Sequence, residues 1–225
     1  MSKKKYALLV VAHPDDESIF FSGLLMNNRK LPWKVVCVTD GNADLAGSKR
    51  ADQFKKACGL LKVESQQWSF PDKFETRLDT EKLMLKLMEL DPPEVVYTHE
   101  ILGEYGHPHH QDVSYAVHRA FSKKKCVWSV AYNSFPQTTF GFTKAQYKIK
   151  TRILTKTYQS ETLRFLNFLP LTSKEGYLKT SFSEVDHIYS YFTGKTDLKK
   201  AKLKNFLHLF DYLSERRTLL QSRPF

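Results

Sequence analysis

Short apolar runs alternate with longer segments of helical periodicity over the first 135 residues. Most of these runs are continuously apolar, as expected for strands that are covered on both faces of a sheet. We expect strands at residues 6–11, 33–39, 66–70, 94–98 and 127–133, and helices at residues 18–28, 48–61, 80–90 and 108–121. Alternation of this kind predicts an α/β fold with a mostly parallel sheet and flanking helices.

Residues 136–225 have a looser pattern of aromatic-rich loops and helices. We expect a helix at residues 197–220, where Leu203, Phe206, Leu207, Phe210 and Leu213 form an apolar stripe beside several lysines. Packing of this stripe on the sheet is the favoured interpretation, and a position on a membrane surface is the alternative.

The length of 225 residues, with 41% hydrophobic and 13% aromatic content, fits one well-filled domain. We therefore predict a single domain over residues 1–225. Residues 1–135 would form a Rossmann-like α/β core, and residues 136–225 a helical and loop extension that completes the fold and the pocket.

No apolar run reaches the roughly 18 residues that a membrane-spanning helix needs, and the short apolar run near the N-terminus has no small-residue cleavage site after it. We therefore expect a cytoplasmic protein. The 3 cysteines lack C-x-x-C spacing, which argues against a disulfide framework and against a cysteine-ligated zinc ion.

The net charge of +11 comes from the second part of the chain. Residues 1–122 contain 16 Lys+Arg and 17 Asp+Glu, whereas residues 123–225 contain 19 and 7. This excess favours an anionic partner, such as a phosphorylated or nucleotide-linked small molecule, anionic lipid headgroups or nucleic acid. Solvated lysines without a binding role explain the excess equally well.

Two polar motifs each follow a predicted strand. His13-Pro14-Asp15-Asp16-Glu17 comes after the first strand, and residues 104–110, which end in His107-Pro108-His109-His110, come after the fourth. Ligands of open α/β sheets bind at the carboxyl ends of the strands. We therefore expect the two motifs to meet.

The residue types in these motifs can hold a cation. The two adjacent aspartates must point in different directions, so one can bind a cation together with His13 while the other serves as a base. Pro108 suits the first position of a helix, which would put His107 and His110 on one face and turn His109 away. Two imidazoles and one carboxylate leave coordination positions open, as in a catalytic zinc site whose bound water has a pKa of roughly 7.

Simpler interpretations exist for each motif alone. Helix capping and the helix dipole also select acidic residues at a helix start, and one H-x-x-H pair among 8 histidines is a weak signal. Their coincidence at two strand ends favours a metal site. No glycine-rich phosphate loop follows the first strand, which argues against a nicotinamide cofactor or ATP.

Residues 12–17, Ala-His-Pro-Asp-Asp-Glu, resemble the first motif of the PIG-L/LmbE-type zinc-dependent N-acetylglucosaminyl deacetylases. The likeness extends to the turn at residues 39–41, to Arg50 and to the H-x-x-H pair of His107 and His110, and it covers about the first 135 residues. It implies an enzyme that removes the N-acetyl group from an N-acetylglucosamine-type sugar in a glycoconjugate or metabolite.

The resemblance also implies roles for single residues. His13, Asp16 and His110 would bind Zn²⁺, with Fe²⁺ as an alternative metal. Asp15 would be the general base. His107 would be a protonatable group that stabilises the oxyanion and helps the amine to leave.

Two further residues correspond to functional positions of the family. Tyr105 matches a tyrosine that assists the transition state in some members, and Arg50 would bind substrate, with a surface helix arginine as its alternative interpretation. Many relatives have an aspartate where this chain has His109, and many have a glutamate where it has Gln53. The usual orienting partner of His107 is therefore absent.

Three classes of function follow from these observations. The leading one is the deacetylase, with an N-acetylated sugar as its substrate, free or in a phosphorylated, nucleotide-linked or lipid-linked form. The second is a non-haem iron(II) oxygenase, because two histidines and a carboxylate can also form that site. The third is binding to nucleic acid or a membrane surface through the basic part. In the leading class we expect no nucleic acid partner, and peripheral membrane contact stays open.

Four histidines are isolated in the sequence, which indicates structural roles: His99, His118, His187 and His208. Among them His99 ends a predicted strand and could instead line the cleft.

Overall fold

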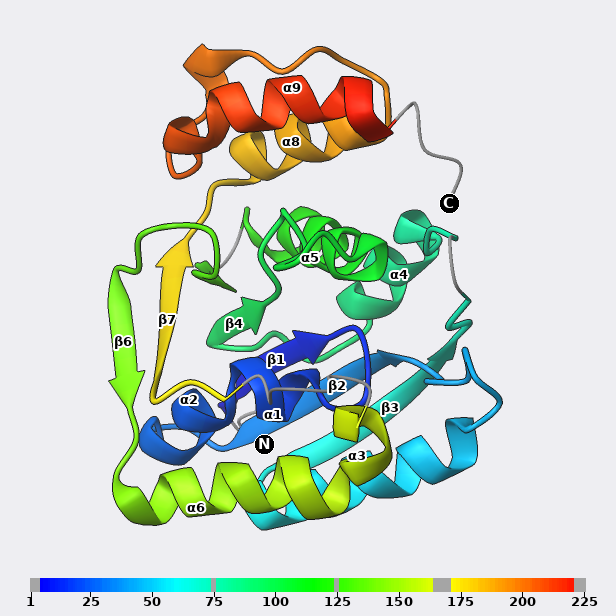
Figure 1. Ribbon diagram of the computed structural model, residues 1–225, viewed down its shortest axis with the longest axis vertical. Coiled ribbons are helices and arrows are strands. Elements are labelled where there is room, and N and C mark those ends of the chain that lie inside the picture. The colour runs from blue at the N-terminus through cyan, green and yellow to red at the C-terminus, as the bar shows by residue number, and fades with distance from the viewer. Residues whose placement is uncertain (1–4, 74–75, 124–125, 164–170, 221–225) are drawn as a thin grey trace.

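A seven-stranded sheet forms the centre of the computed structural model, which describes residues 5–73, 76–123, 126–163 and 171–220 (Figure 1). The strands are β1 (Ala7–Val11), β2 (Trp33–Thr39), β3 (Glu64–Phe70), β4 (Val95–Thr98), β5 (Val127–Val130), β6 (Thr138–Gly141) and β7 (Lys174–Lys179). Their order is β3-β2-β1-β4-β5-β7-β6. Strands β1 to β5 pair in parallel, whereas β7 is antiparallel to both β5 and β6. The predicted α/β fold with a mostly parallel sheet is confirmed.

Helices lie on both sides of the sheet. They are α1 (Asp16–Phe20), α2 (Ser22–Asn27), α3 (Gly47–Leu61), α4 (Thr80–Met88), α5 (Pro108–Phe121), α6 (Lys144–Arg152), α7 (Gln159–Thr162), α8 (Phe182–Phe192) and α9 (Phe210–Leu220). A π-helical turn, η1 (Ile153–Thr157), continues α6, and two 3₁₀ turns, η3 (Lys200–Lys202) and η4 (Leu207–Leu209), precede α9.

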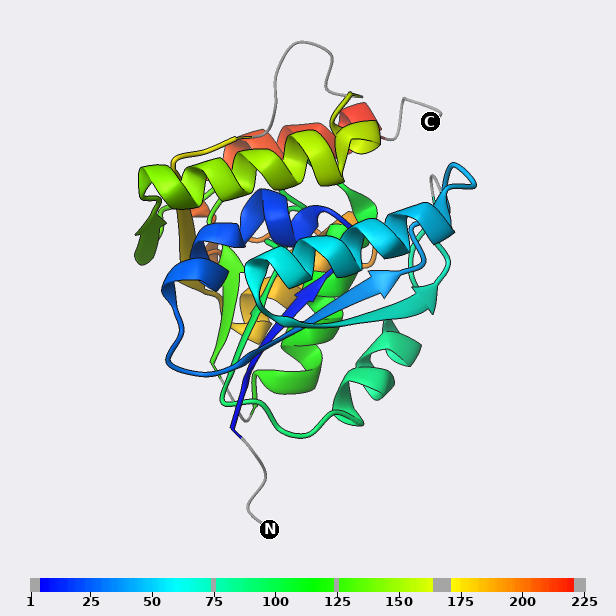
Figure 2. The ribbon, with the colours of Figure 1, turned by 90° about the horizontal axis from the view of Figure 1, so that it is seen from below.

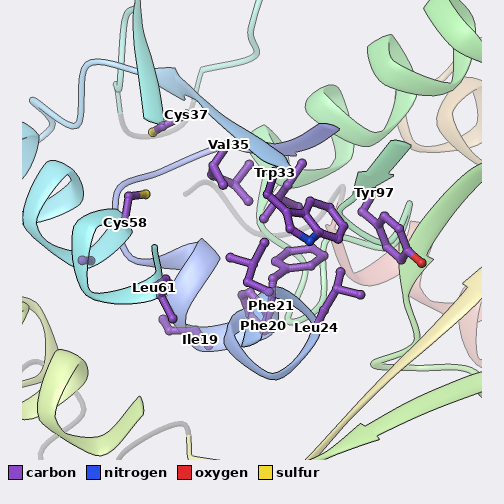
Figure 3. Packing of buried hydrophobic residues seen from close by; sticks show 14 of the residues in the cluster. Ile19, Phe20, Phe21, Leu24, Trp33, Val35, Cys37, Cys58, Leu61 and Tyr97 are labelled. Carbon is purple, nitrogen blue, oxygen red and sulfur yellow. The ribbon is translucent and has the colours of Figure 1, made fainter. Parts of the chain in front are cut away.

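The side chains of β1 divide between two hydrophobic cores, because successive residues of a strand point to opposite faces. Leu9 and Val11 belong to a core under α1, α2, α3 and η1, which Figure 3 shows from close by. Leu8 and Val10 belong to a core under α4 and α5. Figure 2 shows the two groups of helices on either side of the strands. Burial on both faces explains why this run is continuously apolar.

The elements predicted for the first part exist, with one correction. The predicted helix at residues 18–28 is two helices, because Phe21 leaves the helical conformation with φ −131° and ψ 0°. The carboxylate of Glu175 in β7 accepts hydrogen bonds from the backbone N–H groups of Gly23 (2.8 Å) and Leu24 (3.2 Å). It therefore caps the start of α2, and the prediction failed because this partner lies 152 residues away.

The second part of the chain completes the sheet with β6 and β7 and adds a third apolar cluster. Leu203, Phe206 and Leu213 pack with side chains of α8 in this cluster, rather than on the sheet. The predicted continuous helix at residues 197–220 is wrong, since regular α-helix begins only at Phe210. The Glu184 carboxylate accepts the backbone N–H groups at positions 204 and 205, and so favours a turn there.

The described residues also bear on membrane-spanning helices and on the state of the cysteines. No helix in residues 5–73, 76–123, 126–163 or 171–220 is long and apolar enough to cross a membrane. Cys37 and Cys58 are buried free thiols, and Cys126 is an exposed one.

The strand order determines where ligand-binding residues gather. The chain moves outward from β1 through β2 to β3, and then returns to place β4 on the other side of β1. This reversal puts the carboxyl ends of β1 and β4 next to each other, at the position where open α/β sheets bind ligands. The two polar motifs follow these two strands.

Candidate metal centre

The first motif leaves β1 and enters α1 within a few residues. Asp16 is the first residue of α1, and its Oδ2 accepts a hydrogen bond of 2.8 Å from the backbone N–H of His13. Asp15 has a φ of 120°, a conformation that L residues rarely adopt and that functional sites often retain at a cost. This turn gives the adjacent aspartates different partners: Asp16 contacts histidines, whereas Asp15 Oδ2 lies 3.5 Å from Arg50 Nη2.

The second motif forms the start of α5. Pro108 occupies the first turn of the helix, and His107 is its N-cap. The Nδ1 atom of His107 accepts a hydrogen bond of 3.2 Å from the backbone N–H of His109. The ring of His107 is therefore neutral, with its proton on Nε2. His110 follows within the first turn and is completely buried.

His13, Asp16 and His110 bring two imidazole nitrogens and both oxygens of one carboxylate together. His13 Nδ1 is 3.2 Å from His110 Nε2 and 3.5 Å from Asp16 Oδ2, and His110 Nε2 is 3.5 Å from Asp16 Oδ1. Two atoms that each lie about 2.1 Å from a tetrahedral zinc ion are roughly 3.4 Å apart. The three separations therefore fit a cation held between these buried side chains.

A second layer of buried side chains orients this group. His110 Nδ1 lies 2.6 Å from Glu104 Oε2, so its N–H donates to the carboxylate and Nε2 is directed to the group. His99 Nε2 lies 3.3 Å from Asp16 Oδ2 and accepts a hydrogen bond of 2.9 Å from the backbone N–H of Ala12. His99 therefore lines the site. His99 and Glu104 both follow β4, and this position after a strand is the signal that could have identified Glu104 in the sequence.

His109 also belongs to the site, and the prediction that it turns away is wrong. Its Nδ1 is 3.1 Å from His13 Nε2 and 3.5 Å from Asp72 Oδ1. Asp72, which follows β3, has the same oxygen 3.5 Å from His13 Nε2. The prediction failed because helical spacing was counted from His107, which is the N-cap and lies outside the regular helix.

Arg50 of α3 is buried and is therefore not the surface arginine of its alternative interpretation. Its guanidinium nitrogens lie 3.5 Å from Asp15, 3.5 Å from Asp72 and 3.6 Å from Glu161. It also donates a hydrogen bond of 3.0 Å to the carbonyl of Pro14. These carboxylates compensate the positive charge of Arg50, which the uncharged side chain of Gln53 cannot do.

The pKa of His13 reflects its position between two carboxylates. Burial lowers this pKa, but the nearby carboxylates of Asp16 and Asp72 outweigh the effect and raise the pKa to about 9. A proton must therefore leave the ring when a cation binds to its Nδ1.

The pKa values of the two residues with expected catalytic roles move in opposite directions. Burial, and then the neighbouring Asp16 carboxylate, raise the pKa of Asp15 well above its usual range, against the effect of Arg50. Burial and the surrounding histidines lower the pKa of His107 to about 2. Asp15 is thus a stronger base than an exposed aspartate, and His107 stays neutral over the physiological pH range.

Residues of both parts of the chain border this centre. The ring centroid of Tyr105 is 5.5 Å from that of His110, and its side chain is largely exposed. From the second part, the Tyr158 hydroxyl lies 2.9 Å from Glu17 Oε1. Burial raises the pKa of Glu17 to about 7, although hydrogen bonds oppose the shift. The π-helical turn before Tyr158 brings this side chain to the site.

The family follows from a match that includes both motifs. Residues 8–121, half of the chain, match the family model described as PIG-L: GlcNAc-PI de-N-acetylase. The chain belongs to the PIG-L family. The resemblance seen in residues 12–17 is thereby confirmed.

Curated relatives match about half of the chain. An uncharacterized protein of Acanthamoeba polyphaga mimivirus is 33% identical over 123 residues, which are 48% of this chain and 54% of that protein. The N-acetylglucosaminyl-phosphatidylinositol de-N-acetylase of Saccharomyces cerevisiae is 28% identical over 127 residues, 48% of this chain and 41% of that protein. The chain spans about half the length of the curated relatives it matches.

Solved structures share the fold over a larger part of the chain. A deacetylase involved in teicoplanin biosynthesis has a TM-score of 0.60 at 15% identity, with 78% of this chain and 99% of that chain covered. The N,N'-diacetylchitobiose deacetylase of Pyrococcus horikoshii has a TM-score of 0.57 at 16% identity, with 80% and 85% covered. These similarities confirm the fold of the PIG-L chain.

Proposed function

We propose that the chain is a metal-dependent amide hydrolase that removes the N-acetyl group from an N-acetylglucosamine-type sugar. The observation that carries this proposal is the group of ligand atoms from His13, Asp16 and His110 beside the partly buried Asp15 carboxylate. Membership of the PIG-L family, whose model is described by a de-N-acetylase, supports the substrate class.

His13, Asp16 and His110 would hold the metal, for which Zn²⁺ is our first choice and Fe²⁺ the alternative. Zinc in such a site polarises the amide carbonyl and lowers the pKa of bound water to about 7. Glu104 keeps His110 in the orientation for binding through its hydrogen bond of 2.6 Å.

Asp15 would act as the general base in this reaction. Its raised pKa suits the removal of a proton from the attacking water near neutral pH. The same carboxyl group can then return the proton to the nitrogen of the departing amine. The turn with φ 120° and the contact with Arg50 hold Asp15 away from the ligand group, so that it is available as a base.

His107 would stabilise the oxyanion as a neutral hydrogen-bond donor. Its Nδ1 accepts the N–H of His109, which leaves the Nε2–H for the developing negative charge. This refines the role expected from the family resemblance, because a neutral ring supplies a hydrogen bond but no proton for the amine. Tyr105 at the exposed border of the site would contact the substrate.

The charges around Arg50 bear on the form of the substrate. Asp15, Asp72 and Glu161 surround this single guanidinium, so its positive charge is already compensated. Arg50 is therefore a weak binding group for a phosphate next to the reacting acetamide. We therefore propose a sugar whose phosphate, nucleotide or lipid group, where it has one, lies away from the N-acetyl group, and Arg50 as a group that orients sugar hydroxyls.

Acetate release tests the proposal. The zinc-loaded protein is incubated with N-acetylglucosamine, nucleotide-linked and lipid-linked N-acetylglucosamine and the matching N-acetylgalactosamine compounds. We expect acetate and free amine in equal amounts from at least one member, and none after chelation of the metal. Zinc-loaded protein that releases no acetate from the whole panel would contradict the proposal.

The same assay separates the deacetylase from the iron(II) oxygenase. Hydrolysis proceeds without oxygen, so the rate should be equal in air and under argon. A requirement for oxygen together with iron would favour the oxygenase.

A further inference from the structure

The imidazole of His13 has similar donor sets on both of its nitrogens. On one side, Nδ1 faces the carboxylate of Asp16 and the Nε2 of His110. On the other side, Nε2 faces the carboxylate of Asp72 and the Nδ1 of His109. Each nitrogen thus meets one carboxylate and one further imidazole.

The two sets also have nearly the same dimensions. The atoms His13 Nε2, His109 Nδ1 and Asp72 Oδ1 are separated by 3.1, 3.5 and 3.5 Å. In the set with Asp16 and His110 the corresponding separations are 3.2, 3.5 and 3.5 Å, with Oδ2 of Asp16 facing His13 and Oδ1 facing His110. The triangle around His13 Nε2, which is the second triangle, and the separations of the other set are both close to the roughly 3.4 Å between two donors of one tetrahedral zinc ion.

Hydrogen bonds alone leave the second triangle poorly satisfied. The 3.1 Å contact joins two imidazole nitrogens, so only one of them can carry a proton. The carboxylate oxygen of Asp72 lies 3.5 Å from both, beyond the usual hydrogen-bond length. The other nitrogen of His109, Nε2, is buried and has no hydrogen-bond partner among the described residues. A cation would engage all three atoms at once.

The surroundings hold these three side chains in place. Asp72, His109 and His13 are at most 8% exposed. Arg50 Nη1 contacts Asp72 through Oδ2, which leaves Oδ1 for a cation. The ligand atoms of His13, His107 and His109 also lie within 4.8 Å of one another, so a third imidazole is close to the same point.

We propose that His13 Nε2, His109 Nδ1 and Asp72 Oδ1 form a second cation site, in which the His13 ring bridges two metal ions. Two imidazoles and one carboxylate suit a borderline transition metal such as zinc, cobalt or copper, rather than calcium or magnesium. Both N–H protons of His13 pass to water when the two ions are bound. The site depends on His109, whose Nδ1 is one of its three ligand atoms.

The number of bound ions tests this second site. Metal-free protein is saturated with Zn²⁺, and excess metal is removed by gel filtration in a buffer that contains a weak zinc chelator. The zinc content per chain is then measured by elemental mass spectrometry. We expect two ions per chain in the wild type and one in each of His109→Asn, Asp72→Asn and His110→Asn. His208→Asn removes an exposed histidine and serves as the matched control, which should keep two ions.

A bridged pair has a second signature that needs no variant. Two Cu²⁺ ions joined by one imidazolate couple magnetically, so the electron paramagnetic resonance signal falls below that of the copper content. The signal of His109→Asn, which would bind one copper ion, should match its metal content.

The stoichiometry decides the outcome. A wild-type protein that saturates at one ion per chain would overturn the second site, and so would two ions retained by both His109→Asn and Asp72→Asn. Circular dichroism identifies a variant that fails to fold, and the wild-type result stands without the variants. This inference extends the proposed function, but the two can fail separately. A protein that binds one ion per chain and still releases acetate would contradict the second site and leave the proposed hydrolysis intact.

Discussion

Two buried polar networks among the described residues differ in how completely their atoms are paired. Lys150 of α6 is fully buried, and its Nζ lies 2.7 Å from the carbonyl of Ile19 and 2.9 Å from Glu175 Oε1. Glu175 also accepts hydrogen bonds from the start of α2 and from the hydroxyl of Tyr177, 2.9 Å away. This network joins α6, β7 and α2, whose positions Figure 1 shows.

The histidine cluster around His13 has the opposite character. Its contacts place nitrogen beside nitrogen at 3.1 and 3.2 Å, and His109 Nε2 lacks a partner among the described residues. Buried polar atoms are normally satisfied, so this incomplete pairing supports the proposed cation. The first network therefore stabilises the fold, whereas the second suits the metal ions that we propose.

Asp15→Asn is the substitution next to the histidine cluster for which we expect the largest effect. The variant should lose about 10²- to 10⁴-fold in the rate of acetate release, because it removes a general base. The metal content should be unchanged, since Asp15 does not belong to the ligand group, and asparagine tolerates a positive φ better than most residues.

The matched control is Asp52→Asn on the exposed face of α3, which should retain full activity. Asp15→Asn with a rate within tenfold of the wild type would remove Asp15 from the mechanism.

Lys150→Met tests the fully paired network of Lys150 and Glu175. The substitution leaves the Glu175 carboxylate buried without its cation, so we expect a loss of about 3–5 kcal/mol in the free energy of unfolding. Urea denaturation of the metal-free protein measures it. Lys148→Met on the exposed side of the same helix is the control and should change stability by about 0.5 kcal/mol or less. Equal effects of the two substitutions would contradict the structural role.

His118 sharpens the comparison, because it is a buried histidine that belongs to neither network. Its Nδ1 lies 2.7 Å from the carbonyl of Ser114, and its Nε2 has no partner among the described residues. Burial lowers the pKa of His118 from 6.5 to about 4. The unfolded chain therefore binds more protons between these values, and the stability that His118 contributes falls as the pH drops from 6.5 to 4, by at most about 1.4 kcal/mol per pH unit.

His118→Gln should remove this part of the acid sensitivity. The difference between the unfolding free energies of wild type and variant, measured by urea denaturation from pH 7.5 to about pH 4.5, should change steadily below pH 6.5. Parallel curves for the two proteins would contradict the lowered pKa, because they would mean that His118 binds its proton equally well in the folded and the unfolded chain.

The sequence predicted the parts of the site that depend on local order along the chain. The position of a motif after a strand located both His13 and His110 at one edge of the sheet, since parallel strands end on the same side. The same reasoning could have identified Asp72 and Glu104. It could not have identified the contact of Arg50 with Glu161, because these residues are far apart in the sequence and belong to different parts of the chain.

Long-range partners also explain the errors in the fold. Glu175 divides the predicted first helix, and Glu184 accepts the N–H groups of the predicted last helix. In both cases a buried carboxylate satisfies backbone donors that a continuous helix would have used. Apolar periodicity predicts where a helix packs, but it contains no information about such a partner.

Glu104→Gln gives the smallest expected effect and tests the boundary between the two kinds of network. Glu104 lies in the histidine cluster, yet it is fully paired like Glu175: its oxygens contact His110 at 2.6 Å, His99 at 3.2 Å and the backbone N–H of Glu100 at 2.9 Å. These histidines lower the pKa of Glu104 to about 2, although burial alone would raise it.

The variant keeps every ligand but weakens the acceptor that orients His110, so we expect the zinc affinity to fall by about 10- to 100-fold. Competition with a chromogenic chelator measures this change. His110→Asn, which removes the ligand itself, should lose far more affinity. If Glu104→Gln left the affinity unchanged and lowered only the stability of the metal-free protein, Glu104 would belong with Glu175 as a purely structural carboxylate. If the substitution lowered the zinc affinity and left the stability of the metal-free protein unchanged, the hydrogen bonds of Glu104 would act mainly in metal binding.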